Sequence, residues 1–117
     1  MRKIVIAFDV DGTLRCNREE IHREKIVPNL NIVRLWETLS GFKNVELHIW
    51  SNRGADYCRE IAKRFDLQKV KGYHKKTWKS QQDANDEWDS DDFRPDIAID
   101  DQQRFDGGLF NLIVREK

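Results

Sequence analysis

Two acidic residues near the N-terminus have the spacing needed for nucleophilic and acid–base chemistry. Asp9 and Asp11 are separated by one residue and follow the apolar run of residues 4–8. One carboxylate of such a pair could attack phosphorus and form an aspartyl-phosphate. The other could protonate the leaving oxygen and then deprotonate the water that hydrolyses the intermediate. Gly12 permits a sharp turn after a strand, so the pattern favours a catalytic loop over an Asp-Gly turn that closes a hairpin.

A second polar pair, Ser51 and Asn52, directly follows the apolar run of residues 45–50. A hydroxyl and free backbone N–H groups between a strand and a helix N-terminus can cradle a phosphate. Serine and asparagine are also ordinary helix caps, so this pair indicates phosphate binding only in combination with the other groups.

A third polar pair, Asp100 and Asp101, follows the apolar run of residues 95–99. Adjacent carboxylates repel each other, so burying both is unfavourable unless a cation lies nearby. Mg²⁺ takes carboxylates, waters and phosphate oxygens as ligands, and with Asp9 this pair could supply its protein ligands. The alternative is a surface turn in a chain that is already rich in acids.

A lysine is expected beside these groups, because a phosphoryl transition state spreads negative charge that a cation must neutralise. Lys75, Lys76 and Lys79 lie between the second and third polar pairs. Lys76 is the preferred candidate because it comes just after a short strand that would end near Tyr73, and Lys79 is the second candidate. The alternative for each of them is a solvated surface lysine.

Strands that alternate with helices would position these groups. We expect strands at residues 4–8, 45–50, 69–73, 95–99 and 109–114. The alternation predicts an α/β fold, in which a parallel sheet has helices on its faces. Ligands of such sheets bind at the carboxyl ends of the strands, so the three polar pairs would converge on one site.

Two helices are expected between these strands. The first would have Pro28 in its first turn and Gly41 as its C-cap. A helical spacing of apolar residues supports both helices, with Ile32, Leu35, Trp36 and Leu39 in the first and Ala55, Cys58, Ala62 and Phe65 in the second. Residues 15–27 are expected to form a loop, and the acidic residues 81–92 form either a loop or a short polar helix.

The composition limits the classes of function. The 117 residues carry 21 basic and 21 acidic side chains, so no overall charge attracts the protein to nucleic acid or membrane. Cys16 and Cys58 belong to no zinc-binding or CxxC pattern and are expected to be free thiols. The N-terminal apolar run is too short for a signal peptide, and no run approaches a membrane span. We therefore expect a soluble, cytoplasmic protein that forms one domain over residues 1–117 and has no membrane partner.

The chain resembles the haloacid dehalogenase-like (HAD) hydrolase superfamily through four motifs in family order. Residues 9–13 (DVDGT) are similar to the first motif, DxDGT, and residues 47–51 (LHIWS) to the second, an apolar strand ending in serine or threonine. Lys76 matches the third motif, a single lysine. Residues 97–101 (IAIDD) are similar to the fourth, an apolar strand ending in two acids. The first motif is quite specific and the fourth moderately so, whereas the other two are weak alone.

The resemblance implies a Rossmann-like sheet and Mg²⁺ as the cofactor. It implies that Asp9 is the nucleophile and a metal ligand, and that Asp11 is the acid–base whose backbone carbonyl also binds the metal. Asp101 would be the direct metal ligand of the fourth motif, with Asp100 beside it or one step removed from the ion. Family dehalogenases lack the second aspartate of the first motif, so Asp11 indicates phosphoryl transfer.

The phosphate-binding groups implied by the resemblance are Ser51, with its neighbour Asn52, and Lys76. The intervals between the motifs leave no room for a cap domain, and capless members of the family often act on large substrates or borrow a neighbouring subunit to close the site. A homo-oligomer would meet that need. The fourth motif and the residues before it are also similar to the phosphatase half of phage polynucleotide kinase–phosphatases, although that likeness is short.

One basic segment favours nucleic acid as the substrate. Residues 69–79 hold five lysines and no acid, together with Tyr73 and Trp78. Lysines contact phosphates and aromatic rings stack on bases, although a solvated loop explains the segment equally well. The sequence therefore predicts a Mg²⁺-dependent phosphatase acting through an aspartyl-phosphate, on polynucleotide ends or on a small metabolite. A catalytically silent phosphate-binding protein on the same fold is the alternative.

Overall fold

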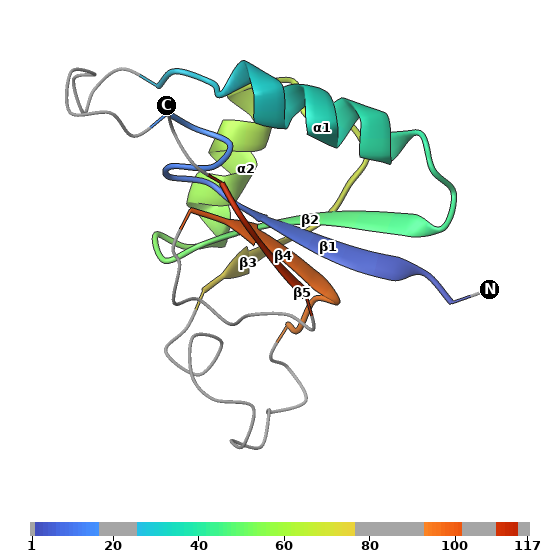
Figure 1. Cartoon of the computed structure of the whole chain (residues 1–117). Coiled ribbons are helices and arrows are strands. Elements are labelled where there is room, and N and C mark those ends of the chain that lie inside the picture. Colours follow the sequence, from blue (N-terminus) through green and yellow to red (C-terminus); the bar gives the residue numbers. More distant parts are fainter. Residues whose placement is uncertain (1, 17–25, 77–92, 102–109, 115–117) are drawn as a thin grey trace.

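The protein is built on one sheet of five parallel strands in the computed structural model, which describes residues 2–16, 26–76, 93–101 and 110–114 (Figure 1). The strands lie in the order β3-β2-β1-β4-β5. This arrangement confirms the predicted α/β, Rossmann-like fold, and the described residues form no cap domain over the sheet. In chain order the elements are β1 (Ile4–Asp9), α1 (Leu30–Ser40), β2 (Val45–Ser51), α2 (Ala55–Arg64), β3 (Val70–Lys75), β4 (Ile97–Asp100) and β5 (Phe110–Ile113).

The central strand β1 is buried because it has apolar residues on both faces of the sheet. Ile6 and Phe8 face the helices, whereas Ala7 faces the opposite side. The register aligns Phe8 with Ile49 of β2 and with Ile99 of β4, so like side chains meet across three neighbouring strands. A strand buried on both faces has a continuous apolar run in its sequence, and for this reason β1 could be predicted from the sequence.

Both described helices pack on the same side of the sheet (Figure 1). Trp36 of α1 lies edge-on to Phe8, with ring centroids 5.0 Å apart, and its indole N–H donates to the carbonyl of Gln68 at 2.9 Å. Cys58 and Ile61 of α2 complete this core. Neither described helix is long and apolar enough to cross a membrane.

The other face of the sheet has a small aromatic cluster. Ala7, Trp50 and Ala98 are buried there, and Phe93 packs against them. Helices were predicted on both faces. Both described helices lie on one face, and most of the two connections that flank β4, residues 77–92 and 102–109, lies outside the described residues. The predicted choice between loop and helix at 81–92 lies there as well.

The prediction for the start of α1 was wrong. The helix begins at Leu30 with Asn29 as its N-cap, so Pro28 precedes the helix instead of occupying its first turn. Pro28 forms an antiparallel bridge with Arg15, and the Asn29 N–H donates to the carbonyl of Leu14 at 2.8 Å. This pairing keeps the backbone extended until Asn29. The predicted C-cap, Gly41, is in place.

Candidate functional site

The polar groups predicted to converge do lie at one edge of the sheet. Strand β1 ends at Asp9, β2 ends at Ser51 and β4 ends at Asp100. These are three adjacent parallel strands, so their carboxyl ends meet at the same edge. All three residues are buried, with exposed fractions of 6%, 3% and 3% respectively.

Lys76 joins two of these strand ends. It directly follows β3, and its backbone N–H donates to the carbonyl of Ser51 at 2.9 Å, which fixes its place beside β2. The ammonium donates to Asp9 Oδ1 at 2.9 Å and to Asp100 Oδ2 at 2.6 Å. Its side chain is only 2% exposed. Burying an ammonium is tolerated here because two carboxylates compensate its charge.

A third carboxylate, that of Asp101, lies close to the two that contact Lys76. Oxygen atoms of Asp9, Asp100 and Asp101 lie within 4.8 Å of one another. Burial, together with the charges of Asp100 and Asp101, raises the pKa of Asp9 to about 7 despite the opposing effect of Lys76. Burial and the hydrogen bond with Asp100 raise the pKa of Asp101 to about 6. The cluster has more potential negative charge than Lys76 can neutralise, so its residues fit a divalent cation.

The loop after β1 is closely fitted to this cluster. Gly12 has a φ of +86°, and a Cβ on it would overlap the carboxylate of Asp101. Glycine is therefore required both by the backbone and by the close approach of the acid. The hydroxyl of Thr13 donates to Asp9 Oδ2 at 3.3 Å, so each oxygen of Asp9 has a donor.

The second polar pair forms the turn between β2 and α2. Ser51 Oγ accepts the backbone N–H of Arg53 at 3.1 Å, and the Ser51 carbonyl accepts the N–H of Gly54. Asn52 is exposed in the same turn. The hydroxyl oxygen of Ser51 is therefore already engaged as an acceptor, and Asn52 is an exposed residue of the turn.

The side chain of Asp11 is held by a set of residues that the sequence did not predict. Tyr57 of α2 donates its hydroxyl to Asp11 Oδ1 at 2.6 Å, and Arg15 donates to the Tyr57 oxygen at 2.8 Å. Arg15 also lies 3.5 Å from Asp11 Oδ1, and Arg53 lies 3.9 Å from Asp11 Oδ2. Burial and the hydrogen bond to Asp11 raise the pKa of Tyr57, which keeps its hydroxyl protonated near neutral pH.

A positional signal for Tyr57 was present in the sequence. The first turn of a helix that follows a parallel strand lies at the carboxyl edge of the sheet, and α2 begins at Ala55. A tyrosine in that turn can therefore reach the loop after β1. Arg15 lacked such a signal, because the course of residues 14–16 depends on their pairing with residues 27–29.

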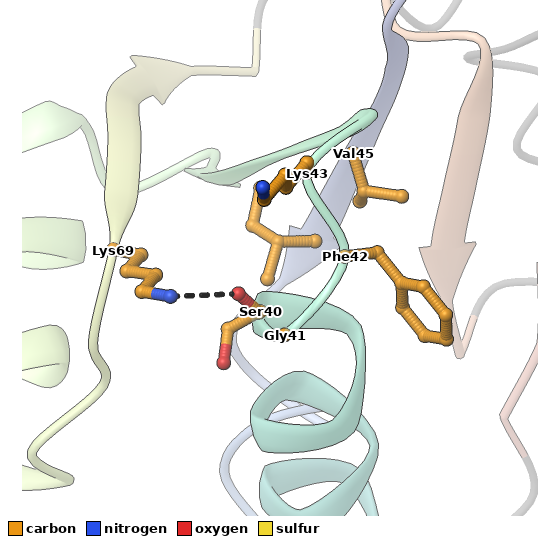
Figure 2. Close-up of a pocket in the computed structure, with 7 residues that line it drawn as sticks. Ser40, Gly41, Phe42, Lys43, Val45 and Lys69 are labelled. Atoms are coloured by element: carbon orange, nitrogen blue, oxygen red, sulfur yellow. Dashed lines mark hydrogen bonds between the residues drawn. The ribbon is translucent and has the colours of Figure 1, made fainter.

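The basic segment at 69–79 is divided between the two ends of β3. Lys69 comes just before the strand, at the end away from the Asp9 cluster, and it lines a pocket of about 220 Å³ beside the C-terminus of α1 (Figure 2). Its ammonium donates to the carbonyl of Ser40 at 3.2 Å, as expected for a lysine at a helix C-terminus. Lys75 is exposed at the carboxyl end. Trp78 and Lys79 lie outside the described residues.

Comparison with protein-family models, with curated proteins and with solved structures finds no match. The resemblance to HAD-like hydrolases therefore depends on the four motifs, and membership of that superfamily stays a prediction. A function for this chain has to be inferred from the geometry of the site and from those motifs.

Proposed function

We propose that this protein is a Mg²⁺-dependent phosphomonoesterase that acts through an aspartyl-phosphate on Asp9. The observation that carries this proposal is the buried contact of Asp9 and Asp100 with Lys76, at the carboxyl edge of a parallel sheet. Phosphoryl transfer requires a nucleophile with positive charge fixed beside it, because negative charge spreads over the phosphate oxygens in the transition state. A buried lysine beside a buried carboxylate supplies both.

The cation in this proposal would be held by Asp9 and Asp101, with Asp100 beside them. These three residues are the group of potential ligands among the described residues, and hard carboxylate oxygens suit Mg²⁺. The resemblance adds the backbone carbonyl of Asp11 as a further ligand. When bound, Mg²⁺ would neutralise charge on the phosphate oxygens and favour the ionised form of the surrounding carboxylates.

The proposed reaction has two displacements at phosphorus. Asp9 attacks the phosphate, the phosphorus–oxygen ester bond breaks, and the ester oxygen keeps the electron pair and takes a proton from Asp11. Water then attacks the phosphorus of the aspartyl-phosphate and gives its proton to Asp11, while the bond between Asp9 and phosphorus breaks and inorganic phosphate is released. Lys76 stays charged throughout, because the pKa of its ammonium is raised by Asp9 and Asp100 despite its burial.

The proposed substrate is the phosphorylated end of a polynucleotide. The described residues form no cap domain over the sheet, and a site without a cap offers little surface to a small ligand, whereas a large one can bind along the rim. Lys75 is exposed at the carboxyl end of β3 and could contact such a chain. Lys69 is engaged at the other end of the strand, so fewer lysines of the basic segment support this substrate than the sequence suggested. A small phosphorylated metabolite is the alternative.

The proposal is tested by measuring hydrolysis of an aryl phosphate with Mg²⁺ and with a chelator. Asp9→Asn keeps the shape of the side chain but removes the attacking charge, so turnover should fall by at least about 10³-fold. Asp56→Asn is the matched control, because Asp56 is a fully exposed acid on α2 that pairs only with Arg59 among the described residues. Acid quenching of the wild-type reaction on a ³²P-labelled ester should trap a phosphorylated protein that Asp9→Asn does not form.

Four results would count against the proposed reaction, cation or substrate. Activity of Asp9→Asn above about a tenth of wild type would exclude the nucleophile, and equal activity with the chelator would exclude the cation. Binding of phosphate without turnover of any ester would favour the catalytically silent alternative. Oligonucleotides with terminal phosphates should be preferred over a sugar phosphate at low salt, and the preference should shrink as salt rises. Equal kcat/KM for both would favour the small-metabolite alternative.

A further inference from the structure

Tyr57 and Arg15 surround one oxygen of the Asp11 carboxyl group. Tyr57 comes from the first turn of α2 and lies 46 residues from Asp11, yet its hydroxyl is only 2.6 Å from Asp11 Oδ1. Arg15 approaches the same oxygen at 3.5 Å and the Tyr57 oxygen at 2.8 Å. The guanidinium of Arg53 stacks on the Tyr57 ring at 3.9 Å from its centroid, which restricts the ring. Tyr57 is therefore held in place by contacts with Asp11, Arg15 and Arg53.

The hydrogen-bond donors around Tyr57 determine where its hydroxyl proton points. A guanidinium has only donors, so the Tyr57 oxygen must accept from Arg15. A phenol has one proton, and the remaining partner at hydrogen-bond distance among the described residues is Asp11 Oδ1. Asp11 Oδ1 therefore accepts the hydrogen bond from Tyr57 whether the carboxyl group is ionised or carries its own proton on Oδ2.

We propose that Tyr57 is a positioning residue for the acid–base carboxyl group of Asp11, and that Asp11 Oδ2 is the oxygen that exchanges protons with the substrate. This inference rests on the phosphatase function proposed above. When the ester bond breaks, the ester oxygen keeps the electron pair and receives the proton from Asp11 Oδ2, while Tyr57 keeps its own proton. Without the tyrosine hydroxyl the carboxyl group loses its shortest contact and keeps only Arg15 at 3.5 Å from Oδ1 and Arg53 at 3.9 Å from Oδ2. Its orientation is then less restricted, and the proton is less often aligned with the leaving oxygen.

A leaving-group series separates this role from a purely structural one. Dinitrophenol leaves readily as an anion and needs little protonation, whereas benzyl alcohol needs a proton as it leaves. The ratio of kcat/KM for benzyl phosphate to that for dinitrophenyl phosphate therefore reports proton donation, because kcat/KM includes the steps up to departure of the alcohol. A general loss of folding or binding would lower both values together.

The test variant is Tyr57→Phe, and Tyr73→Phe is its matched control. Tyr73 is the other tyrosine of the chain, and its ring also packs on the core that faces the helices. In Tyr57→Phe the benzyl phosphate value should fall about tenfold and the dinitrophenyl phosphate value less than about threefold, since general acid catalysis is worth about 10²-fold or more in total. Tyr73→Phe should leave the ratio unchanged.

Two further variants test the same role without relying on Tyr57→Phe alone. Arg15→Met should lower the same ratio, because it removes the donor that directs the Tyr57 proton. In an Asp11→Ala background, Tyr57→Phe should have no further effect on the ratio, since two residues that act through one proton transfer are not additive.

The outcomes distinguish this inference from the function on which it rests. If the wild type hydrolyses neither ester, the proposed function fails and the inference fails with it. If the wild type is active but Tyr57→Phe lowers both esters equally, or lowers neither, only the positioning role is refuted. An equal change of the ratio in Tyr73→Phe would also refute it.

Discussion

Removing the buried ammonium of Lys76 should destabilise the protein strongly unless a divalent cation replaces it. In Lys76→Met the chain keeps a side chain of similar length, but the carboxylates of Asp9 and Asp100 lose their shared partner at 2.9 and 2.6 Å. Both carboxylates are less than a tenth exposed, so water cannot readily compensate them. Removing one partner of a buried ion pair typically costs about 3–5 kcal/mol.

The expected loss can be measured by urea or thermal unfolding in a chelator. We expect the free energy of unfolding to fall by about 3 kcal/mol and the melting temperature by about 10 °C. Lys75→Met is the matched control, because Lys75 is the preceding residue on β3 and is exposed. That variant should change stability by less than about 0.5 kcal/mol.

Added Mg²⁺ should restore much of the stability of Lys76→Met. A ligand that binds only the folded state stabilises it by about 2.7 kcal/mol at a concentration one hundred times its Kd. The variant should gain more than the wild type, because no ammonium competes for Asp9 and Asp100. Wild-type stability of Lys76→Met in chelator would refute the buried ion pair, and a variant that does not respond to Mg²⁺ would refute the cation site.

Three further predictions concern the metal, the loop after β1 and the second face of the sheet. Asp101→Ala should raise the Mg²⁺ concentration for half-maximal activity more than it raises KM, because it removes a hard oxygen ligand; an unchanged half-saturation point would exclude this residue as a ligand. Gly12→Ala should lower the free energy of unfolding by about 1–3 kcal/mol, since alanine is strained at a positive φ and its Cβ would displace the Asp101 carboxylate. An unchanged free energy of unfolding in denaturant would contradict that geometry. His74 of β3 lies on the second face, where its ring stacks on Phe93 with centroids 3.8 Å apart. Burial, with the charge of the neighbouring His48 adding to it, lowers the pKa of His74 to about 4, so the folded state binds fewer protons than the unfolded state between pH 6.5 and 4. The free energy of unfolding should therefore decline as pH falls through this window, by on the order of 1 kcal/mol after allowance for partial exposure. The stability of His74→Gln should decline less over the same pH range when both proteins are unfolded in parallel.

The sequence alone determined the elements whose pattern is local. The apolar run before Asp9 specified a strand buried on both faces, and the helical spacing that includes Trp36 specified the buried face of α1. The alternation of strands and helices then implied a parallel sheet, and a parallel sheet brings its strand ends to one edge. That chain of inference was enough to place Asp9, Ser51 and Asp100 together.

Pro28 shows where local patterns fail. Proline suits the first turn of a helix, and the sequence contained no sign that residues 27–29 pair with residues 14–16. That pairing holds Pro28 in an extended segment and moves the start of α1 to Leu30. A long-range contact thus overrode a propensity that is correct on average.

Only the tertiary structure decided which side chains touch at the site. Lys76 reaches Asp9 across 67 residues of sequence, and Tyr57 reaches Asp11 across 46. Such contacts depend on the register of β3 against β2 and on the angle at which α2 leaves the sheet. The same register sends Lys69 to the opposite end of β3, although it belongs to the same basic segment. Sequence spacing fixes the face of an element on which a residue lies, but contact across elements depends on how those elements are packed.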